Sequence, residues 1–263
     1  IEAGAAVDQT EEDGFTALML ACQDGHDRVA RVMIEAGAEI DKVNNKGLTA
    51  AMFACQGGHD CCLLVMIEAG VNLEATLTSG HTTLMIACQN GHDPCALQLI
   101  KAGAKVDQTA ENGATALMIA CANGHDPCIR VMIEAKVDVD KTTEEGRTAL
   151  MSACKNGHDP CALQLIEAKA DVNHAATDGR TALMFVCKNG HDHCARVMVE
   201  AKVDVDKTTE EGWTALRMGK SEPFGLRNDA PESSCKLKLE RGAKVLKRAM
   251  GRGSIRSHVH LHH

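Results

Sequence analysis

The sequence predicts an all-α solenoid, in which short helix-turn-helix-loop units stack one on another. The first observation is a constant repeat length of 33 residues, marked by Gly14, Gly47, Gly80, Gly113, Gly146, Gly179 and Gly212. The second is that a threonine follows each of these glycines in phase, and a histidine does so in the first six repeats. Self-similarity of this period is typical of repeat proteins whose units contact mainly their neighbours.

Each unit is predicted to contain two helices. In the fourth unit Thr115 is a candidate N-cap for a first helix that runs through the apolar sequence ALMIAC. An Asn-Gly or Asp-Gly pair ends this helix, because glycine readily adopts a positive φ. Asp126-Pro127 then predicts the start of the second helix, with aspartate as N-cap and proline at the first helical position. The polar segment Asp140–Gly146 leads to the next unit as an extended loop.

The repeat pattern divides the chain into four parts. Residues 1–13 match the end of a repeat, so we expect the first half of that unit to lie outside this sequence. Six complete repeats occupy residues 14–211. Residues 212–245 are interpreted as a degenerate C-terminal capping repeat with an insertion, since the end of a solenoid requires a polar outer face. Residues 246–263 are basic, end in histidines and are predicted to be disordered.

Charge is unevenly distributed along the chain. Residues 1–216 carry 17 Lys and Arg against 32 Asp and Glu, whereas residues 217–263 carry 11 against 4. The acidic body argues against nucleic acid along the repeats, because phosphate binding requires cations. The basic end is suited to an acidic partner. Runs without a charged residue, such as Gly113–His125, are too short to cross a bilayer, so no membrane insertion is expected.

These repeats resemble the ankyrin repeat over residues 1–216. The family pattern G-x-T-P-L-H-x-A-A-x-x-G-H appears as GATALMIACANGH from Gly113 to His125, and its G-A-D-V-N ending appears as GAEID from Gly37. The resemblance implies projecting β-hairpin-like loops and a non-catalytic scaffold or adaptor that binds proteins. One departure is that Lys136, Lys169 and Lys202 replace the helix-end glycine. A side chain in the left-handed region costs about 1 kcal/mol.

The resemblance also implies a contact face, formed by the loop tips and the first helices on the concave side. Its first candidates directly follow each repeat glycine, where side chains vary while the flanking framework stays constant: Phe15, Leu48, His81, Ala114, Arg147, Arg180 and Trp213. The second candidates precede the Gly-His pairs: Gln23, Asp24, Gln89, Asn90, Lys155, Asn156, Lys188 and Asn189. The face is acidic near Glu11–Asp13 and basic around the last repeats, which predicts a charge gradient along it.

The 13 cysteines raise the question of metal binding. A Cys-x3-His-x2-Cys spacing recurs, as at Cys88, His92 and Cys95, and offers soft ligands of the kind that zinc accepts. The alternative is that both cysteines pack as small buried residues while the histidine bonds to the backbone. In the first repeat Val29 replaces the second cysteine although Cys22 remains, which favours packing. No metal, cofactor or catalytic residue is therefore predicted. Disulfides between repeats are not expected either, because stacked helices lie about 8–10 Å apart.

Three functions remain open. The first is an interaction module that holds a partner protein along its contact face. The second is a targeting or scaffolding segment of a larger enzyme or channel, and the third is a Cys/His metal- or redox-responsive repeat protein. The sequence has no P-loop, nucleophile elbow or dinucleotide fingerprint, so neither an enzyme nor a small-molecule substrate is expected. The odd number of cysteines indicates a reducing intracellular compartment, cytoplasmic or nuclear.

Overall fold

The computed structural model describes residues 6–219, and α-helices are the regular elements within this range. The chain divides into two compact units, Ile1–Glu144 and Glu145–His263. The first unit contains α1 (Ala17–Gln23), α2 (Asp27–Glu35), α3 (Ala50–Gly57), α4 (Asp60–Glu68), α5 (Thr83–Asn90), α6 (Asp93–Lys101), α7 (Ala116–Asn123) and α8 (Asp126–Glu134). The second contains α9 (Ala149–Asn156), α10 (Asp159–Glu167), α11 (Ala182–Asn189), α12 (Asp192–Glu200) and α13 (Ala215–Met218).

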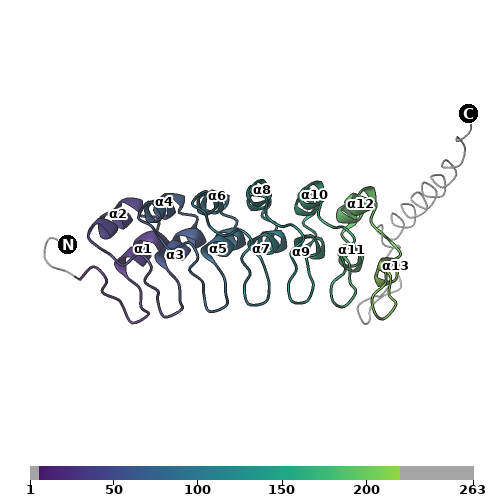
Figure 1. Ribbon diagram of the computed structural model, residues 1–263, viewed down its shortest axis with the longest axis horizontal. Coiled ribbons are helices and arrows are strands. Elements are labelled where there is room, and N and C mark those ends of the chain that lie inside the picture. Colours follow the sequence, from purple (N-terminus) through teal and green to yellow (C-terminus); the bar gives the residue numbers. More distant parts are fainter. Residues whose placement is uncertain (1–5, 220–263) are drawn as a thin grey trace, which may run out of the picture. The chain divides into compact units, whose positions relative to one another are not determined.

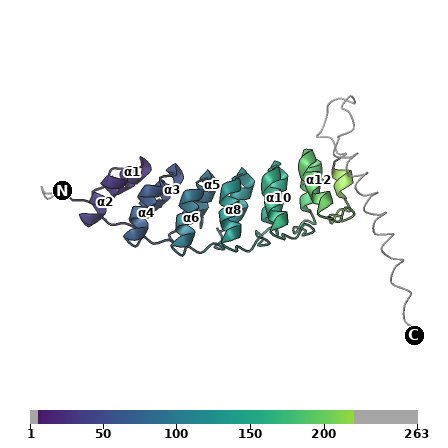
Figure 2. The same cartoon turned by 90° about the horizontal axis from the view of Figure 1, so that it is seen from above.

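Within each unit the helices form two layers. In the first unit α1, α3, α5 and α7 lie beside the projecting loops, and α2, α4, α6 and α8 form the other layer (Figure 1). Seen from above, the helices of this second layer lie side by side (Figure 2). In the second unit α9, α11 and α13 lie beside the loops, whereas α10 and α12 form the other layer. The predicted all-α architecture of stacked helix-turn-helix-loop repeats is confirmed.

The repeat threonines start the first helices as predicted. Thr115 has an extended backbone (φ −100°, ψ 164°), and its Oγ1 accepts a hydrogen bond from the Met118 amide at 3.3 Å. An N-cap of this kind satisfies an amide that would otherwise be unpaired and contributes about 1 kcal/mol. Thr181 has the same backbone conformation but makes no side-chain cap bond. The same cap bond is present at Thr16, Thr49, Thr82, Thr148 and Thr214.

The second helices begin one residue earlier than predicted. In α6, Asp93 is already helical and His92 occupies the N-cap position without a side-chain cap bond. His92 makes no side-chain cap bond because its ring is turned to the preceding repeat, where its Nε2 lies 3.2 Å from the Gln56 carbonyl oxygen. The prediction of an aspartate N-cap is therefore wrong by one position. In the first turn Asp93 still interacts favourably with the positive end of the helix dipole.

The loops between repeats are short hairpins that bond to one another. The Asp138 amide donates to Asp107 Oδ1 at 3.1 Å, and Lys141 Nζ donates to the Asp107 carbonyl oxygen at 2.6 Å. These contacts join one hairpin to the next and stabilise the loop against fraying. Isolated antiparallel β-bridges close four of the hairpins, which confirms the expected β-hairpin-like loops: Thr76–Thr82, Thr109–Thr115, Ala175–Thr181 and Thr208–Thr214.

The ends of the second helices show the predicted left-handed residues. Lys136, Lys169 and Lys202 have φ values of 59°, 71° and 61°, at the position where Gly37 and Gly103 have 88° and 97°. Of the predicted capping repeat the structure describes residues 212–219, which include α13. The predicted insertion and the basic tail lie outside the described residues. Among the described helices, none has the length and apolar character needed to cross a membrane.

Candidate functional site: the loop-tip and first-helix face

The residue after each repeat glycine is held in place through its backbone, by a hydrogen bond across the hairpin. Its carbonyl oxygen accepts a hydrogen bond from the amide four residues earlier, as between Ala110 and Ala114 at 2.9 Å. Because no side-chain atom takes part, the hairpin forms whichever residue stands there. The other such bonds run from Glu11 to Phe15, Asn44 to Leu48, Leu77 to His81, Ala176 to Arg180 and Thr209 to Trp213, at 2.8–3.1 Å. All seven predicted contact residues at this position are half-buried rather than fully exposed.

In the first unit this face is apolar and contains a hollow. Phe15 lies against Phe53 of the next repeat, with ring centroids 5.0 Å apart, so Phe15 also stabilises the stacking of the two repeats. A hollow of about 300 Å³ lies beside this pair and is lined by Gln23, Phe53, Gln56 and Gly57. Leu20 adds an exposed apolar side chain on α1.

Sequence reasoning missed the middle of the first helix as part of this face. Phe53 occupies the fourth helical position, and the hollow shows that its ring borders open space although the residue is only 6% exposed. The available signal was variability, since this position also changes from repeat to repeat, although less than the predicted contact position does: Leu20, Phe53, Ile86, Ile119, Ser152 and Phe185.

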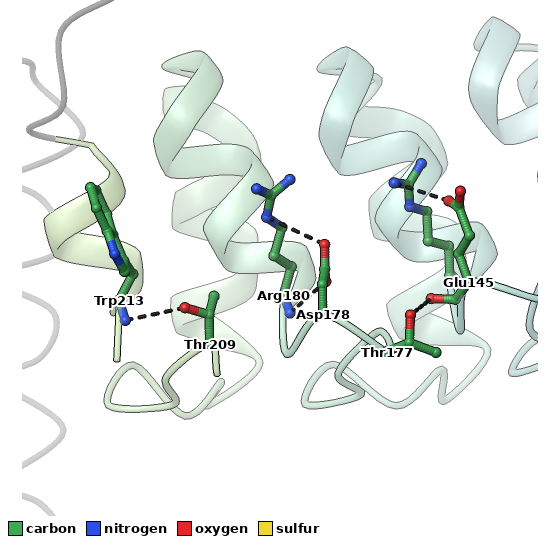
Figure 3. A network of polar contacts seen from close by, with 7 residues as sticks. Glu145, Thr177, Asp178, Arg180, Thr209 and Trp213 are labelled. Carbon is green, nitrogen blue, oxygen red and sulfur yellow. Dashed lines mark hydrogen bonds and ion pairs between the residues drawn. The ribbon is translucent and has the colours of Figure 1, made fainter. Parts of the chain in front are cut away.

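In the second unit the face carries arginines that are held by carboxylates of their own hairpins. Arg147 lies 3.0 Å from Glu145, and Arg180 lies 3.4 Å from Asp178 (Figure 3). These pairs orient the guanidinium groups and reduce the positive charge that the sequence alone suggests. Surface pairs of this kind contribute little to stability.

Trp213 forms the aromatic part of the same face. Its amide donates to Thr209 Oγ1 at 3.2 Å (Figure 3), and the Arg217 guanidinium lies 4.5 Å from the centre of its ring. A cation over an indole face is attracted by the ring quadrupole. Together they present a flat, half-buried aromatic surface and an exposed cation.

The residues before the Gly-His pairs are all exposed at the ends of the first helices: Gln23, Asp24, Gln89, Asn90, Lys155, Asn156, Lys188 and Asn189. The backbone carbonyl oxygens of several of these residues lie within hydrogen-bonding distance of the histidine of the next repeat. His59 Nε2 lies 3.0 Å from the Gln23 carbonyl oxygen, and His125 Nε2 lies 3.0 Å from that of Gln89. In the second unit His191 makes the same contact with Lys155 at 3.1 Å. The histidines therefore bridge neighbouring repeats, as the packing interpretation expects.

Comparison with known families agrees with this geometry. A family model described as ankyrin repeats (3 copies) matches residues 1–77, 36–110, 84–176 and 164–219. The chain belongs to the ankyrin repeat family. Ankyrin repeat domains are protein–protein interaction modules and are generally not enzymes.

Solved ankyrin repeat structures share the fold. The human ASB11 ankyrin repeat domain superposes with a TM-score of 0.76 and 23% identity, covering 87% of this chain and 98% of that one. The ankyrin repeat domain of Bcl-3, a member of the IkappaB protein family, gives a TM-score of 0.71 and 23% identity, covering 80% and 96%. Comparison with curated protein sequences gives no significant match.

The cysteines of these ankyrin repeats pair between repeats rather than within one. Within the described residues no group of three or more His, Cys, Asp or Glu is arranged to hold a metal ion. Instead, the cysteine of one first helix lies close to the cysteine of the next repeat's second helix, as at Cys22 and Cys62, where Cys62 Sγ is 4.0 Å from the neighbouring Ala21 carbonyl oxygen. In the first repeat Val29 replaces the second cysteine, but the structure places Cys22 near Cys62 of the next repeat. The replacement by Val29 therefore says nothing about this pairing. The same pairing is present at Cys55–Cys95, Cys88–Cys128 and Cys154–Cys194.

Burial keeps the thiols of Cys22 and Cys62 protonated. It raises the pKa of Cys22 to about 12, with the adjacent Cys62 adding to the effect. It also raises the pKa of Cys62 to about 11, with Asp27 nearby as a second cause. Since the thiolate is the nucleophile, such thiols are inert at neutral pH.

We expect Cys61 to be the one described cysteine that alkylates quickly in the folded protein. Cys61 is exposed, whereas the other cysteines among residues 6–219 are buried. Brief iodoacetamide treatment at pH 7.5, followed by peptide mapping, measures this directly. Labelling in 6 M urea provides the control, in which all thiols react. Labelling of Cys22 or Cys62 as fast as Cys61 would contradict the burial described here.

Proposed function

We propose that this protein is a non-catalytic scaffold or adaptor that binds a partner protein across its loop-tip and first-helix face. The observation that carries the proposal is the position after each repeat glycine. Its backbone is fixed by the hairpin bond, while its side chain ranges from Ala114 to Trp213. A position whose backbone is fixed and whose side chain varies from repeat to repeat is available for recognition.

The two units offer different chemistry to a partner. The first unit presents Phe15, Leu20 and Leu48 as apolar side chains, a hollow beside the Phe15–Phe53 pair, and the acidic segment Glu11–Asp13. This combination suits an apolar side chain next to a cationic one. Burying apolar surface contributes roughly 25 cal/mol per Å² before the costs of association.

The second unit suits an acidic segment that carries an aromatic or apolar residue. Lys155 and Lys188 are exposed there, and Trp213 with Arg217 supplies the residue types that dominate binding energy at interfaces. Arg147 and Arg180 are preoriented by their carboxylates, which lowers the entropy lost when they bind. The many buried cysteines suit a reducing compartment, so the proposal includes a cytoplasmic or nuclear location.

A contact-face variant tests the proposal. Leu48→Ala, Arg180→Ala and Trp213→Ala alter the face without touching the Phe15–Phe53 stacking contact. The matched control changes exposed residues of the second-helix layer: Arg130→Ala, Leu163→Ala and Arg196→Ala. We expect proteins that copurify with the wild type to be recovered at least tenfold less with the face variant and unchanged with the control. Both variants should melt as the wild type does. Full recovery by a folded face variant would refute the proposed face.

A further inference from the structure

Three clusters of sulfur atoms lie in the core and have no assigned role. In the first, Cys22 Sγ lies 3.6 Å from Met66 Sδ, and Cys62 Sγ lies 4.0 Å from the carbonyl oxygen of Ala21, next to Cys22. The side chains of Cys22, Cys62 and Met66 are fully buried. The equivalent clusters are Cys88, Cys128 and Met132, with 3.6 Å between Cys88 Sγ and Met132 Sδ, and Cys154, Cys194 and Met198, with 3.8 Å between Cys154 Sγ and Met198 Sδ.

Helix geometry explains why the three sulfur atoms converge. Cys62 and Met66 are four residues apart on α4, so both side chains lie on the same face of that helix. Cys22 reaches them from α1 of the preceding repeat. Each cluster therefore takes one thiol from a first helix and a thiol–thioether pair from the next second helix. Each lies wholly within one of the two units.

The spacing of the sulfur atoms suits a three-coordinate metal ion. A metal–sulfur bond of about 2.3 Å places the three sulfur atoms of a planar trigonal site about 4.0 Å apart. The thiol–thioether distances of 3.6 Å and 3.8 Å fall short of this by only a few tenths of an ångström. Small side-chain rotations would bring this edge of each cluster to the required length.

We propose that each cluster is a binding site for one Cu(I) ion, with two cysteine thiolates and one methionine thioether as ligands. Thiolate and thioether sulfur select Cu(I) among the common metals. Zinc is disfavoured because a structural zinc site requires four ligands drawn from Cys, His, Asp and Glu. This also agrees with the absence of such a zinc-type group among residues 6–219.

Binding must displace two protons for each ion. In the first cluster burial keeps both thiols protonated before binding, so Cu(I) forms two bonds to thiolate sulfur while the two S–H protons leave to solvent. Both Asp27 and Asp60 lie close enough to Cys62 to oppose its ionisation, so the ion itself must stabilise the thiolates. The site is dry and lined by sulfur, which excludes water and the oxygen ligands that harder ions need.

The chain contains its own comparison site. Cys55 and Cys95 form the same thiol pair between neighbouring repeats, but Leu99 stands where the other clusters have methionine. This pair offers two sulfur ligands instead of three. We therefore expect it to lose Cu(I) to a competitor that the three complete clusters withstand.

Competition with a Cu(I) chelator tests the assignment on the full chain. The exposed Cys61 and Cys235, which lies outside the described residues, are first replaced by serine to remove adventitious thiols. The protein is then titrated anaerobically with Cu(I) against bathocuproine disulfonate. We expect three ions to be retained per chain and about two protons to be released per ion, measured in weakly buffered solution.

Two matched variants decide the outcome. Cys22→Ala, Cys88→Ala and Cys154→Ala remove one thiol from every complete cluster, and we expect this variant to retain no ion. Cys55→Ala, Cys121→Ala and Cys187→Ala change the same helical position in the alternate repeats and should leave three ions bound. Equal loss in the two variants, or no retained copper in the parent protein, would overturn the proposal. Circular dichroism checks that both variants are folded.

Discussion

Replacing Gly91 by alanine is expected to destabilise the protein by about 3 kcal/mol. Gly91 has φ +77°, and an added Cβ would lie 2.6 Å from His125 Nδ1 of the next repeat. The left-handed conformation costs about 1 kcal/mol for a residue with a side chain. Displacing the ring adds the loss of its bond to the Gln89 carbonyl oxygen and a packing penalty of about 1 kcal/mol each. Urea unfolding followed by circular dichroism measures the difference.

Gly103→Ala is the matched control. Gly103 has φ +97°, but no atom lies within 4 Å of the place that an added Cβ would take, so backbone strain alone should remain, at about 1 kcal/mol. Combining Gly91→Ala with His125→Ala should cost less than the sum of the single changes, because the ring that collides with the new methyl group is gone. Equal losses of stability for Gly91→Ala and Gly103→Ala, or strict additivity of Gly91→Ala with His125→Ala, would show that the new methyl group does not collide with the His125 ring.

The repeat period and the backbone signals of this chain could be predicted because both are local. A threonine N-cap, a glycine at positive φ and a short apolar helix each depend on a few consecutive residues. Thr115 and Lys136 therefore behave as the sequence indicates. The predicted aspartate N-cap is wrong by one position, since His92 is the actual cap residue and its ring bonds to a different repeat.

The contacts between repeats could not be predicted from one repeat read alone. Cys22 and Cys62 are 40 residues apart and come from different helix layers, so neither the Cys-x3-His-x2-Cys spacing nor the helix separation indicates that their thiols meet. The same holds for Phe15, whose ring in one hairpin is partly covered by Phe53 of the next repeat. On this fold, neighbouring repeats therefore decide which side chains are covered and which remain accessible.

Replacing Lys136, Lys169 and Lys202 together by glycine is expected to stabilise the protein by about 3 kcal/mol. All three residues have φ between 59° and 71°, a region that costs about 1 kcal/mol for a residue with a side chain and almost nothing for glycine. All three are exposed. They lie 33 residues apart in sequence, so their effects should add. The free energy of unfolding in urea measures the gain.

Replacing the same three lysines by alanine separates strain from charge. The alanine variant removes the three positive charges and keeps a Cβ in the left-handed region, so its stability should stay within about 0.5 kcal/mol of the wild type, as for other exposed sites. A gain in the alanine variant equal to that of the glycine variant would assign the effect to charge instead. If strain is the cause, the later repeats are held in an unfavourable backbone conformation by their neighbours. Local opening measured by hydrogen exchange should then decrease in these repeats when glycine replaces the three lysines.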